Sequence, residues 1–251
     1  MAAPLTEAAI ERVRTLIISG RLQPGQRLPA EAELSVELGV SRSSLREAVR
    51  GLVTAGVLDV RRGDGTYVTS LTPHLLLTGI GAAVELMQEE SILDLLESRR
   101  LIEPGVTALA AVRSSADQRE EMAAHLARMA AATSQKDLIR HDTDFHATVA
   151  RASQNPVLAS VLTGISSGTV RTRVWRGIVD ADANHRTVEE HRAILDAIGA
   201  RDAPLAEAAA LVHVASVERW LQTRVDAGSD EPSPVAEDPA RTSATESLTA
   251  V

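Results

Sequence analysis

Four side chains with metal-binding chemistry fall where three predicted helices should be apolar. Asp142 and His146 lie one turn apart on the inward stripe of one helix. His191 and His213 each lie about eleven residues from the turn at 201–202, so an antiparallel hairpin brings them to the same height, roughly 16 Å from that turn. A buried carboxylate is costly without a partner, and neutral imidazoles beside it offer only donors or lone pairs. One divalent cation would satisfy all four.

The alternative interpretation is that each of these four is an ordinary, partly buried polar residue. For a single histidine that interpretation is favoured, and Asp-x-x-x-His is a weak motif by itself. Four residues with metal-binding side chains at compatible depths instead favour a metal site. Because the chain has no cysteine, His, Asp or Glu must hold any metal, and the set suits zinc first, with nickel and manganese as alternatives.

A second group of residues suits nucleic acid. Arg42, Arg46 and Arg50 lie four apart on one exposed helix face, with no acid interleaved on that stripe, and guanidinium groups bind phosphates and the acceptor edge of guanine. A basic hairpin at 57–69 follows. The alternative interpretation, that the arginine stripe is only a solvated helix face, is less favoured. The stripe, the hairpin and the helix-turn-helix spacing all occur within about forty residues. The residues predicted to contact double-stranded DNA are Arg42, Ser43, Ser44, Arg46, Arg50, Arg62, Gly65 and Thr66.

The elements that position these arginines form a helix-turn-helix followed by a wing. Apolar residues at helical spacing indicate two short helices that meet at a turn made by Gly39. Ser41 is placed to cap the second helix, which runs from about Ser43 to Ala55 and ends at Gly56. A helix at 5–19 packs beneath them.

From His74 onward the sequence predicts helices and no convincing strand. Short loops between antiparallel neighbours make this region a bundle, so the fold class is mostly α: an N-terminal winged helix-turn-helix and a C-terminal all-α antiparallel helical bundle. The predicted helices lie at about 75–88, 91–113, 117–132, 135–153, 156–175, 184–199 and 203–225. The inward stripe expected for the last of them is Leu205, Ala209, Val212, His213, Ser216 and Trp220. The expected domains are 1–70, 71–226 and a disordered acidic tail at 227–251.

Charge is divided unevenly along the chain. The net charge is −8, yet residues 1–70 carry nine arginines against eight acids, so the predicted DNA-facing part is not acidic. The first residues lack a basic end and an apolar core, and the longest uncharged apolar stretch, near 75–84, is too short to span a bilayer. We therefore expect a cytoplasmic protein without membrane contact.

Residues 5–69 resemble the winged-helix domain of the GntR family of bacterial transcription regulators. The resemblance rests on the segments 27–34, 39–42, 45–48 and 62–68, together with Leu52 and Gly56. Many relatives carry an operator-reading arginine where this chain has Ala32, so readout should depend more on Arg42, Arg46 and the wing. The resemblance implies a homodimer on a pseudopalindromic operator.

Residues 75–224 are similar to the effector domain of the FadR-like branch of that family, called FCD. The matching segments are Asp142-x-x-x-His146, 152–156, 190–198 and His213. The similarity implies a metal at Asp142, His146, His191 and His213, with open positions for a small carboxylate. Arg99 and Glu103 match the Glu-x-Arg-x-x-x-Glu pattern of the domain: either they form an internal ion pair, or Arg99 grips the effector carboxylate.

Other polar residues are less informative. Arg171, Arg173 and Arg176 are further effector candidates, and the sequence does not choose among them. The histidines that do not fall on the pattern, interpreted as surface residues, are His74, His125, His141 and His185.

The sequence as a whole predicts a regulator, in the first instance a repressor released by a small organic or sugar acid. The alternatives are a metal sensor and a metal-dependent hydrolase. A hydrolase would need a general base beside the metal, and on a helix Glu190 points about 100° away from His191.

Overall fold

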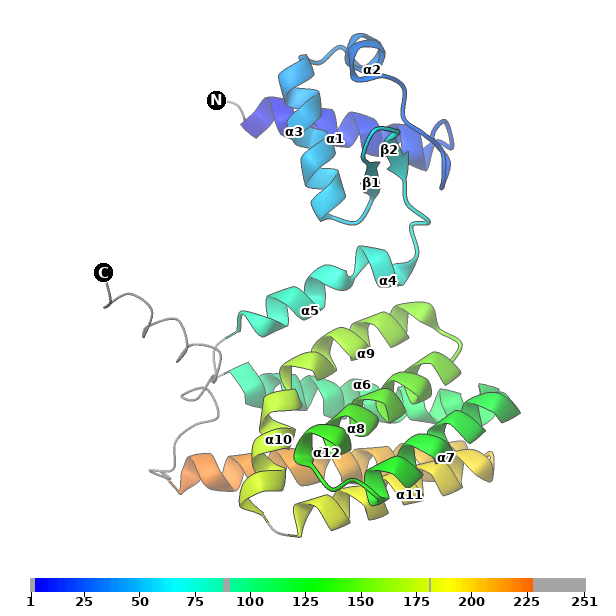
Figure 1. The fold of residues 1–251 in the computed structure, drawn as a ribbon, viewed down its shortest axis with the longest axis vertical. Coiled ribbons are helices and arrows are strands. Elements are labelled where there is room, and N and C mark those ends of the chain that lie inside the picture. Colours follow the sequence, from blue (N-terminus) through cyan, green and yellow to red (C-terminus); the bar gives the residue numbers. More distant parts are fainter. Residues whose placement is uncertain (1–2, 88–90, 181, 228–251) are drawn as a thin grey trace, which may run out of the picture. The chain divides into compact units, whose positions relative to one another are not determined.

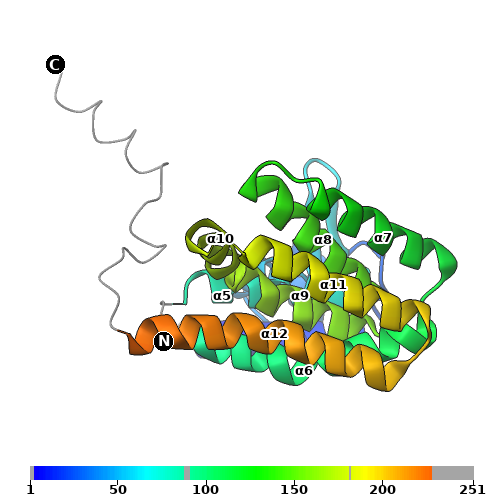
Figure 2. The same cartoon turned by 90° about the horizontal axis from the view of Figure 1, so that it is seen from below.

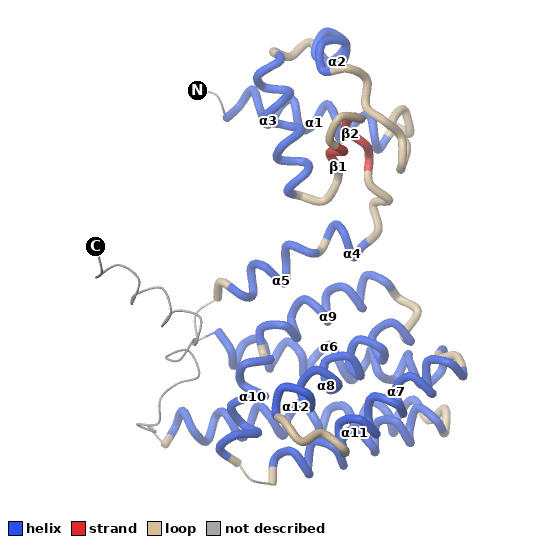
Figure 3. Tube along the Cα trace, viewed as in Figure 1, coloured by secondary structure: helices blue, strands red, loops and turns tan. Residues whose placement is uncertain are grey.

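The computed structural model of the protein describes residues 3–87, 91–180 and 182–227 (Figure 1). These residues are mostly helical, and the strands among them form one hairpin (Figure 3). Contacts within the chain divide it into two compact units, Met1–Gly79 and Ile80–Val251. The predicted tail lies outside the described residues, apart from Ala227 at the end of the last helix.

The helix-turn-helix consists of α2 (Glu31–Leu38) and α3 (Arg42–Thr54). Gly39 makes the turn with a φ of 61°, a left-handed conformation that favours glycine. Ser41 caps α3 as predicted, because its hydroxyl accepts a hydrogen bond from the Ser44 amide at 3.1 Å. Arg12 of α1 (Ala3–Ile18) donates to the carbonyls of Leu38 and Gly39, which fixes the end of α2 on the helix beneath it.

The wing is the antiparallel hairpin of β1 (Leu58–Arg61) and β2 (Gly65–Val68). Leu58 pairs with Val68 at its base, and both side chains are buried in the core of the N-terminal unit. That core joins all three helices to the hairpin, so the wing and α3 share one hydrophobic core. Its buried members are Val13, Leu16, Leu22, Leu28, Leu34, Leu45, Val49, Leu52, Leu58 and Val68.

The remaining helices are short at first and then long. They are α4 (Pro73–Leu76), α5 (Thr78–Glu85), α6 (Ile92–Arg113), α7 (Ala116–Ala130), α8 (Gln135–Ala152), α9 (Pro156–Gly168), α10 (Val170–Val179), α11 (Ala183–Gly199) and α12 (Ala203–Asp226). In the C-terminal unit α6 packs along α12, and α7 packs along α8 (Figure 2). Helix α11 contacts both α12 and α7, which closes the bundle.

Two of the predicted helices are divided in the structure. The segment expected at 75–88 forms α4 and α5, and the segment expected at 156–175 forms α9 and α10, which meet at Thr169. Helix α9 ends in Ser-Ser-Gly, residues with low helix propensity. The Thr169 hydroxyl donates to the Ser166 carbonyl at 3.0 Å and accepts from Arg99 at 3.0 Å, so the break is held by buried hydrogen bonds.

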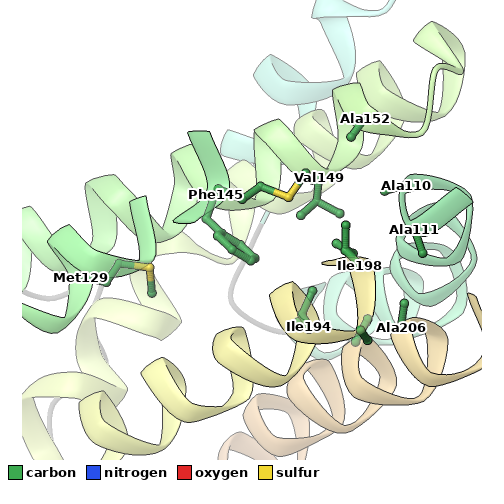
Figure 4. Close-up of a cluster of buried hydrophobic side chains, with 12 residues drawn as sticks. Ala110, Ala111, Met129, Phe145, Val149, Ala152, Ile194, Ile198 and Ala206 are labelled. Carbon is green, nitrogen blue, oxygen red and sulfur yellow. The ribbon is translucent and has the colours of Figure 1, made fainter. Parts of the chain in front are cut away.

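The core of the C-terminal unit lies where α8 faces α11. Phe145 and Val149 of α8 point toward Ile194 and Ile198 of α11, with small alanines of α6 and α12 beside them (Figure 4). Phe145 is fully buried, and its ring contacts His191 edge to face at a centroid distance of 4.8 Å. The apolar core therefore leads directly to the polar cluster.

The inward face of α12 differs from the prediction. Leu205 and Val212 are 53% and 57% exposed, whereas the buried stripe is Ala206, Ala210, His213, Val214, Val217 and Leu221. The helix is apolar on two sides, and the side with alanines is the one that allows close packing against α6. His213 belongs to both stripes, so its burial was predicted correctly. Within the described residues, no helix is long and apolar enough to cross a membrane.

Gly56 offers a test of how α3 is joined to the wing. Its φ is 70°, and a Cβ at this position would lie 2.5 Å from the carbonyl oxygen of Leu75. We expect Gly56→Ala to lower the free energy of unfolding by about 1–3 kcal/mol. Gly51→Ala, in the interior of α3 with ordinary contacts only, should instead stabilise by up to about 1 kcal/mol. Hydrogen exchange of amides 42–68 measures both, and equal effects would contradict this account of Gly56.

Candidate metal centre and DNA-reading face

Helices α8, α11 and α12 bring four buried side chains together. Asp142 and His146 come from α8, His191 from α11 and His213 from α12. Each offers one ligand atom, and the four atoms all lie within 4.8 Å of one another. The predicted convergence of these residues is therefore present, including the equal height of His191 and His213, whose ring centroids are 4.5 Å apart.

Each imidazole of the cluster is held from outside by an oxygen atom. The partners are Glu103 for His146 (Nδ1 to Oε1, 2.6 Å), the Thr187 carbonyl for His191 (2.7 Å from Nδ1) and Glu190 for His213 (Nδ1 to Oε2, 2.9 Å). A carbonyl and ionised carboxylates only accept hydrogen bonds, so each Nδ1 carries the hydrogen. In His191 and His213, whose pKa values are lowered by burial, Nε2 therefore presents a lone pair toward the centre.

The inward-facing atoms lie at close range to one another. Nε2 of His191 lies 3.1 Å from Nε2 of His146 and 3.3 Å from Oδ1 of Asp142. Among the described residues, neither this oxygen nor Nε2 of His213 has a hydrogen-bond partner. Buried acceptors repel one another unless a cation lies among them. Ligands at 2.0–2.1 Å from a tetrahedral zinc ion are about 3.3–3.4 Å apart, close to these two separations, whereas Nε2 of His146 lies farther from Oδ1 of Asp142, at 3.8 Å.

The protonation states of His191 and His213 also suit metal binding. Burial lowers the pKa of His191 to about 3, and the neighbouring His146 adds to the effect. Burial, followed by His191 and His146, also holds the pKa of His213 well below its usual value. Both imidazoles are therefore neutral near pH 7, and the neutral form is the one that binds a metal.

Arginines of α10 border the centre. Arg173 pairs with Oδ2 of Asp142 and also donates to the Ser166 carbonyl at 3.3 Å. Arg176, one turn later, donates to the Ser216 hydroxyl of α12 at 2.8 Å. Arg171 is exposed. The sequence could not choose among these three arginines because the start of α10 was not recognised.

Arg99 and Glu103 form a buried ion pair on α6. Nη2 of Arg99 lies 2.8 Å from Oε2 of Glu103, and Nη1 donates to Thr169 at 3.0 Å. Burial alone would raise the pKa of Glu103, but Arg99 and His146 outweigh it and hold that pKa well below its usual value. Glu103 is thus ionised and orients His146. Of the two interpretations left open by the sequence, the internal ion pair is the arrangement present here.

A small cavity of about 20 Å³ adjoins the centre. Its lining includes Asp142, Arg173, Arg176, Thr187 and His213. This volume has room for a water molecule and is far too small for an organic acid. A larger guest would therefore have to displace a side chain such as Arg173.

Two residues of this site were not recognised in the sequence. Glu190 does point away from His191, but that direction takes it to His213, where it serves as the outer partner. Thr187 contributes through its backbone, and no side-chain pattern reports a backbone carbonyl. Both carboxylates nearest the centre, Glu103 and Glu190, already accept hydrogen bonds from imidazoles, so neither is a free general base.

The remaining histidines divide into two kinds. His74 and His185 are exposed, as predicted. His141 is only 8% exposed and lies beside the half-buried His125, so the prediction that these two are surface residues was wrong. The rings meet because α7 packs closely along α8, and helical spacing within either segment does not reveal that pairing.

The arginine stripe of α3 is exposed but not free of acids. Arg42, Arg46 and Arg50 all face solvent. Arg46 pairs with Glu31 of α2 at 3.1 Å, and Arg50 pairs with Glu47 at 2.7 Å, so the expectation of an acid-free stripe was wrong. Exposed ion pairs of this kind contribute about 0–1 kcal/mol, so phosphates compete with them readily.

The predicted wing contacts lie around the hairpin turn. Arg62 is exposed at the turn, and Gly65 and Thr66 begin β2. Gly65 has a φ of 149°, and a Cβ there would lie 2.5 Å from Nε of Arg27. Glycine at this position lets the Arg27 side chain lie against the turn end of the wing.

Comparison with known proteins matches both domains. Residues 5–68 match the model described as bacterial regulatory proteins, gntR family, and residues 94–216 match the FCD domain. The chain is 32% identical over 212 residues to the transcriptional regulator LutR of Bacillus subtilis, covering 82% of this chain and 96% of LutR. It is 31% identical to the galactonate operon transcriptional repressor of Escherichia coli, covering 82% of this chain and 92% of the repressor.

A solved structure agrees with these matches. The chain resembles Streptococcus agalactiae GntR with a TM-score of 0.64 and 30% identity, covering 86% of this chain and 99% of that one. Together with the exposed recognition helix and wing, the matches show that this chain is a DNA-binding transcription regulator of the GntR family, with an FCD domain after its winged helix-turn-helix.

Proposed function

We propose that this regulator is a repressor that binds a pseudopalindromic operator as a homodimer and is released by a small organic or sugar acid. The observation that carries the proposal is the set of inward acceptors at Asp142, His146, His191 and His213, with every imidazole already oriented from outside. Two E. coli relatives are named for operons of galactonate and of L-lactate dehydrogenase. Galactonate and lactate are hydroxy acids, which supports an effector of that class here.

The four residues are proposed to hold one divalent ion, with zinc favoured and nickel or manganese as alternatives. A bound ion supplies a Lewis-acidic positive centre with coordination positions that a carboxylate can fill. Glu103, Glu190 and the Thr187 carbonyl then act on the ligands, because they fix the tautomer and direction of each ring.

The effector is proposed to enter beside α10. Arg173 and Arg176 line the small cavity next to Asp142 and His213, and a guanidinium binds a carboxylate in two-pronged fashion. An acid larger than water has to draw Arg173 away from Asp142, so binding would shift α10. Arg99 and Glu103 remain proposed contributors: Glu103 orients His146, whereas direct contact with Arg99 would require it to release Glu103 or Thr169.

A metal sensor is the second candidate, and the small cavity favours it, since only the ion fits without rearrangement. The two functions differ in what changes operator affinity: the ion alone for a sensor, and the acid added to metal-loaded protein for an acid-responsive repressor. A hydrolase is set aside, because members of this family are transcription regulators rather than enzymes.

The metal ligands are tested by His191→Ala and His213→Ala. Each variant should lose metal affinity by more than about 100-fold, beyond the effect expected for loss of an outer partner. Operator affinity without effector should stay close to wild type, since neither residue belongs to the winged helix. Metal analysis and operator titration of the same preparations measure both. Variants that stay folded yet lose operator binding would show that the ion is needed for the DNA-bound state. That result would contradict the proposal that the metal centre serves release from the operator.

The proposed contact between α3 and DNA bases is tested by Arg46→Ala. Loss of a base-contacting guanidinium should weaken operator binding by about 1–3 kcal/mol and relax specificity at one position of each half-site. Arg192→Ala is the matched control, because Arg192 is another exposed arginine with a glutamate neighbour, on α11 of the effector domain. Equal operator affinity of Arg46→Ala and wild type would rule out Arg46 as a base contact.

A further inference from the structure

A second cluster of ligand-type side chains lies between α7 and α8, outside the four-residue centre. Nδ1 of His125 is 3.3 Å from Nδ1 of His141, and Oδ2 of Asp144 is 3.9 Å from the same His125 nitrogen. Each of the three offers one ligand atom, and these atoms all lie within 4.8 Å of one another. We call His125, His141 and Asp144 the outer cluster.

The outer cluster differs from the inner centre in its access to solvent. The side chain of His125 is 13% exposed and that of Asp144 is 49% exposed, while His141 is buried behind them. A cation could reach this cluster directly from solvent, and water could complete its coordination. Nothing in the family match or in the four-residue centre accounts for two imidazoles facing one another here.

We propose that the outer cluster binds a second divalent transition-metal ion of the zinc type. Two imidazole nitrogens on one tetrahedral zinc ion lie about 3.3–3.4 Å apart, and the observed separation of the Nδ1 atoms is 3.3 Å. Oδ2 of Asp144, at 3.9 Å from Nδ1 of His125, must come closer to share an ion with it, which its exposed side chain permits. Two imidazoles select such an ion over magnesium or calcium, which prefer oxygen ligands.

The charges around the outer cluster act in both directions. Glu121 lies 3.9 Å from Nε2 of His125, so it can orient that imidazole from outside and offset the charge of an ion. Arg140 opposes binding, because its Nη2 lies 3.2 Å from Nε2 of His141. The side chain of Arg140 is 63% exposed and also lies 3.4 Å from Asp137, so it can turn away at little cost.

A hydrogen-bond chain without any ion is the competing arrangement. In it Arg140 donates to Nε2 of His141, whose Nδ1 then donates to Nδ1 of His125. This chain needs no role for Asp144, whereas an ion uses all three side chains of the outer cluster. Replacing Asp144 therefore separates the two arrangements.

The outer ion would clamp α7 against the turn of α8 that also carries Asp142. His141 and Asp144 flank Asp142 in sequence, and their side chains face His125 of α7. The outer site has three protein ligands in a partly exposed setting, against four buried ligands in the inner centre. We expect it to bind more weakly, by at least about tenfold.

The experiment is a zinc titration of the full chain without a purification tag, after removal of metal by chelation. Wild type should bind two ions per chain, one tightly and one more weakly. His125→Ala should remove only the weaker ion, and His191→Ala only the tighter one. His185→Ala, which removes an exposed histidine of α11, should change neither.

Asp144→Asn is the second variant, because an exposed and nearly isosteric change leaves folding intact. It should weaken the second ion by about 10-fold or more. Cobalt in place of zinc gives an independent readout, since a tetrahedral cobalt site absorbs visible light and His125→Ala should lose the part due to the weaker ion.

Two results would overturn the proposal. In the first, the wild-type chain binds only one ion, and His191→Ala loses it. In the second, the chain binds a second ion, but His125→Ala and Asp144→Asn bind it as tightly as wild type. If instead a single ion is lost in His125→Ala and kept in His191→Ala, the outer site stands and the inner metal of the proposed function fails.

Discussion

The need to satisfy buried polar groups at the centre of the bundle governs much of the C-terminal unit. Three imidazoles and a carboxylate are placed in an interior that otherwise holds Phe145, Val149 and Ile198. Such groups are tolerated only when each hydrogen-bonding atom has a partner. The Nδ1 atoms of the three imidazoles meet this need through Glu103 of α6 and through the Thr187 carbonyl and Glu190 of α11. The cluster therefore ties α6, α8, α11 and α12 together. The inner atoms, which include Oδ1 of Asp142 and Nε2 of His213, would meet it through the divalent ion proposed above.

Helix α10 is the element through which this centre can respond to a guest. Arg173 pairs with Asp142, Arg176 donates to Ser216 of α12, and Trp175 on the same helix packs against the apolar cluster that includes Trp220. The break at Thr169, held by a hydrogen bond from Arg99, separates α10 from α9. An acid that binds Arg173 and draws it away from Asp142, as proposed above, would bias one position of α10 over another, which is what coupling between two sites requires.

Much of this organisation could be predicted from the sequence because it depends on local patterns. Gly39, Ser41 and Gly56 mark the ends of α2 and α3, and the four centre residues fall on helical stripes that the structure buries. What could not be predicted depends on contacts between segments far apart in the chain. Arg46 meets Glu31, Glu190 meets His213, and His125 meets His141 only after the helices have packed. The true face of α12 was missed because that helix is apolar on two sides.

The central claim is that an acid bound at the metal centre opposes operator binding. The most direct measurement is operator affinity of the wild-type chain with and without the carboxylate that most raises its melting temperature, in metal-loaded and in chelator-treated protein. The account predicts that the carboxylate weakens operator affinity by about 5–150-fold in metal-loaded protein only, and that the operator weakens the carboxylate by the same factor. A carboxylate that binds tightly yet leaves operator affinity unchanged, or acts equally after metal removal, would contradict it.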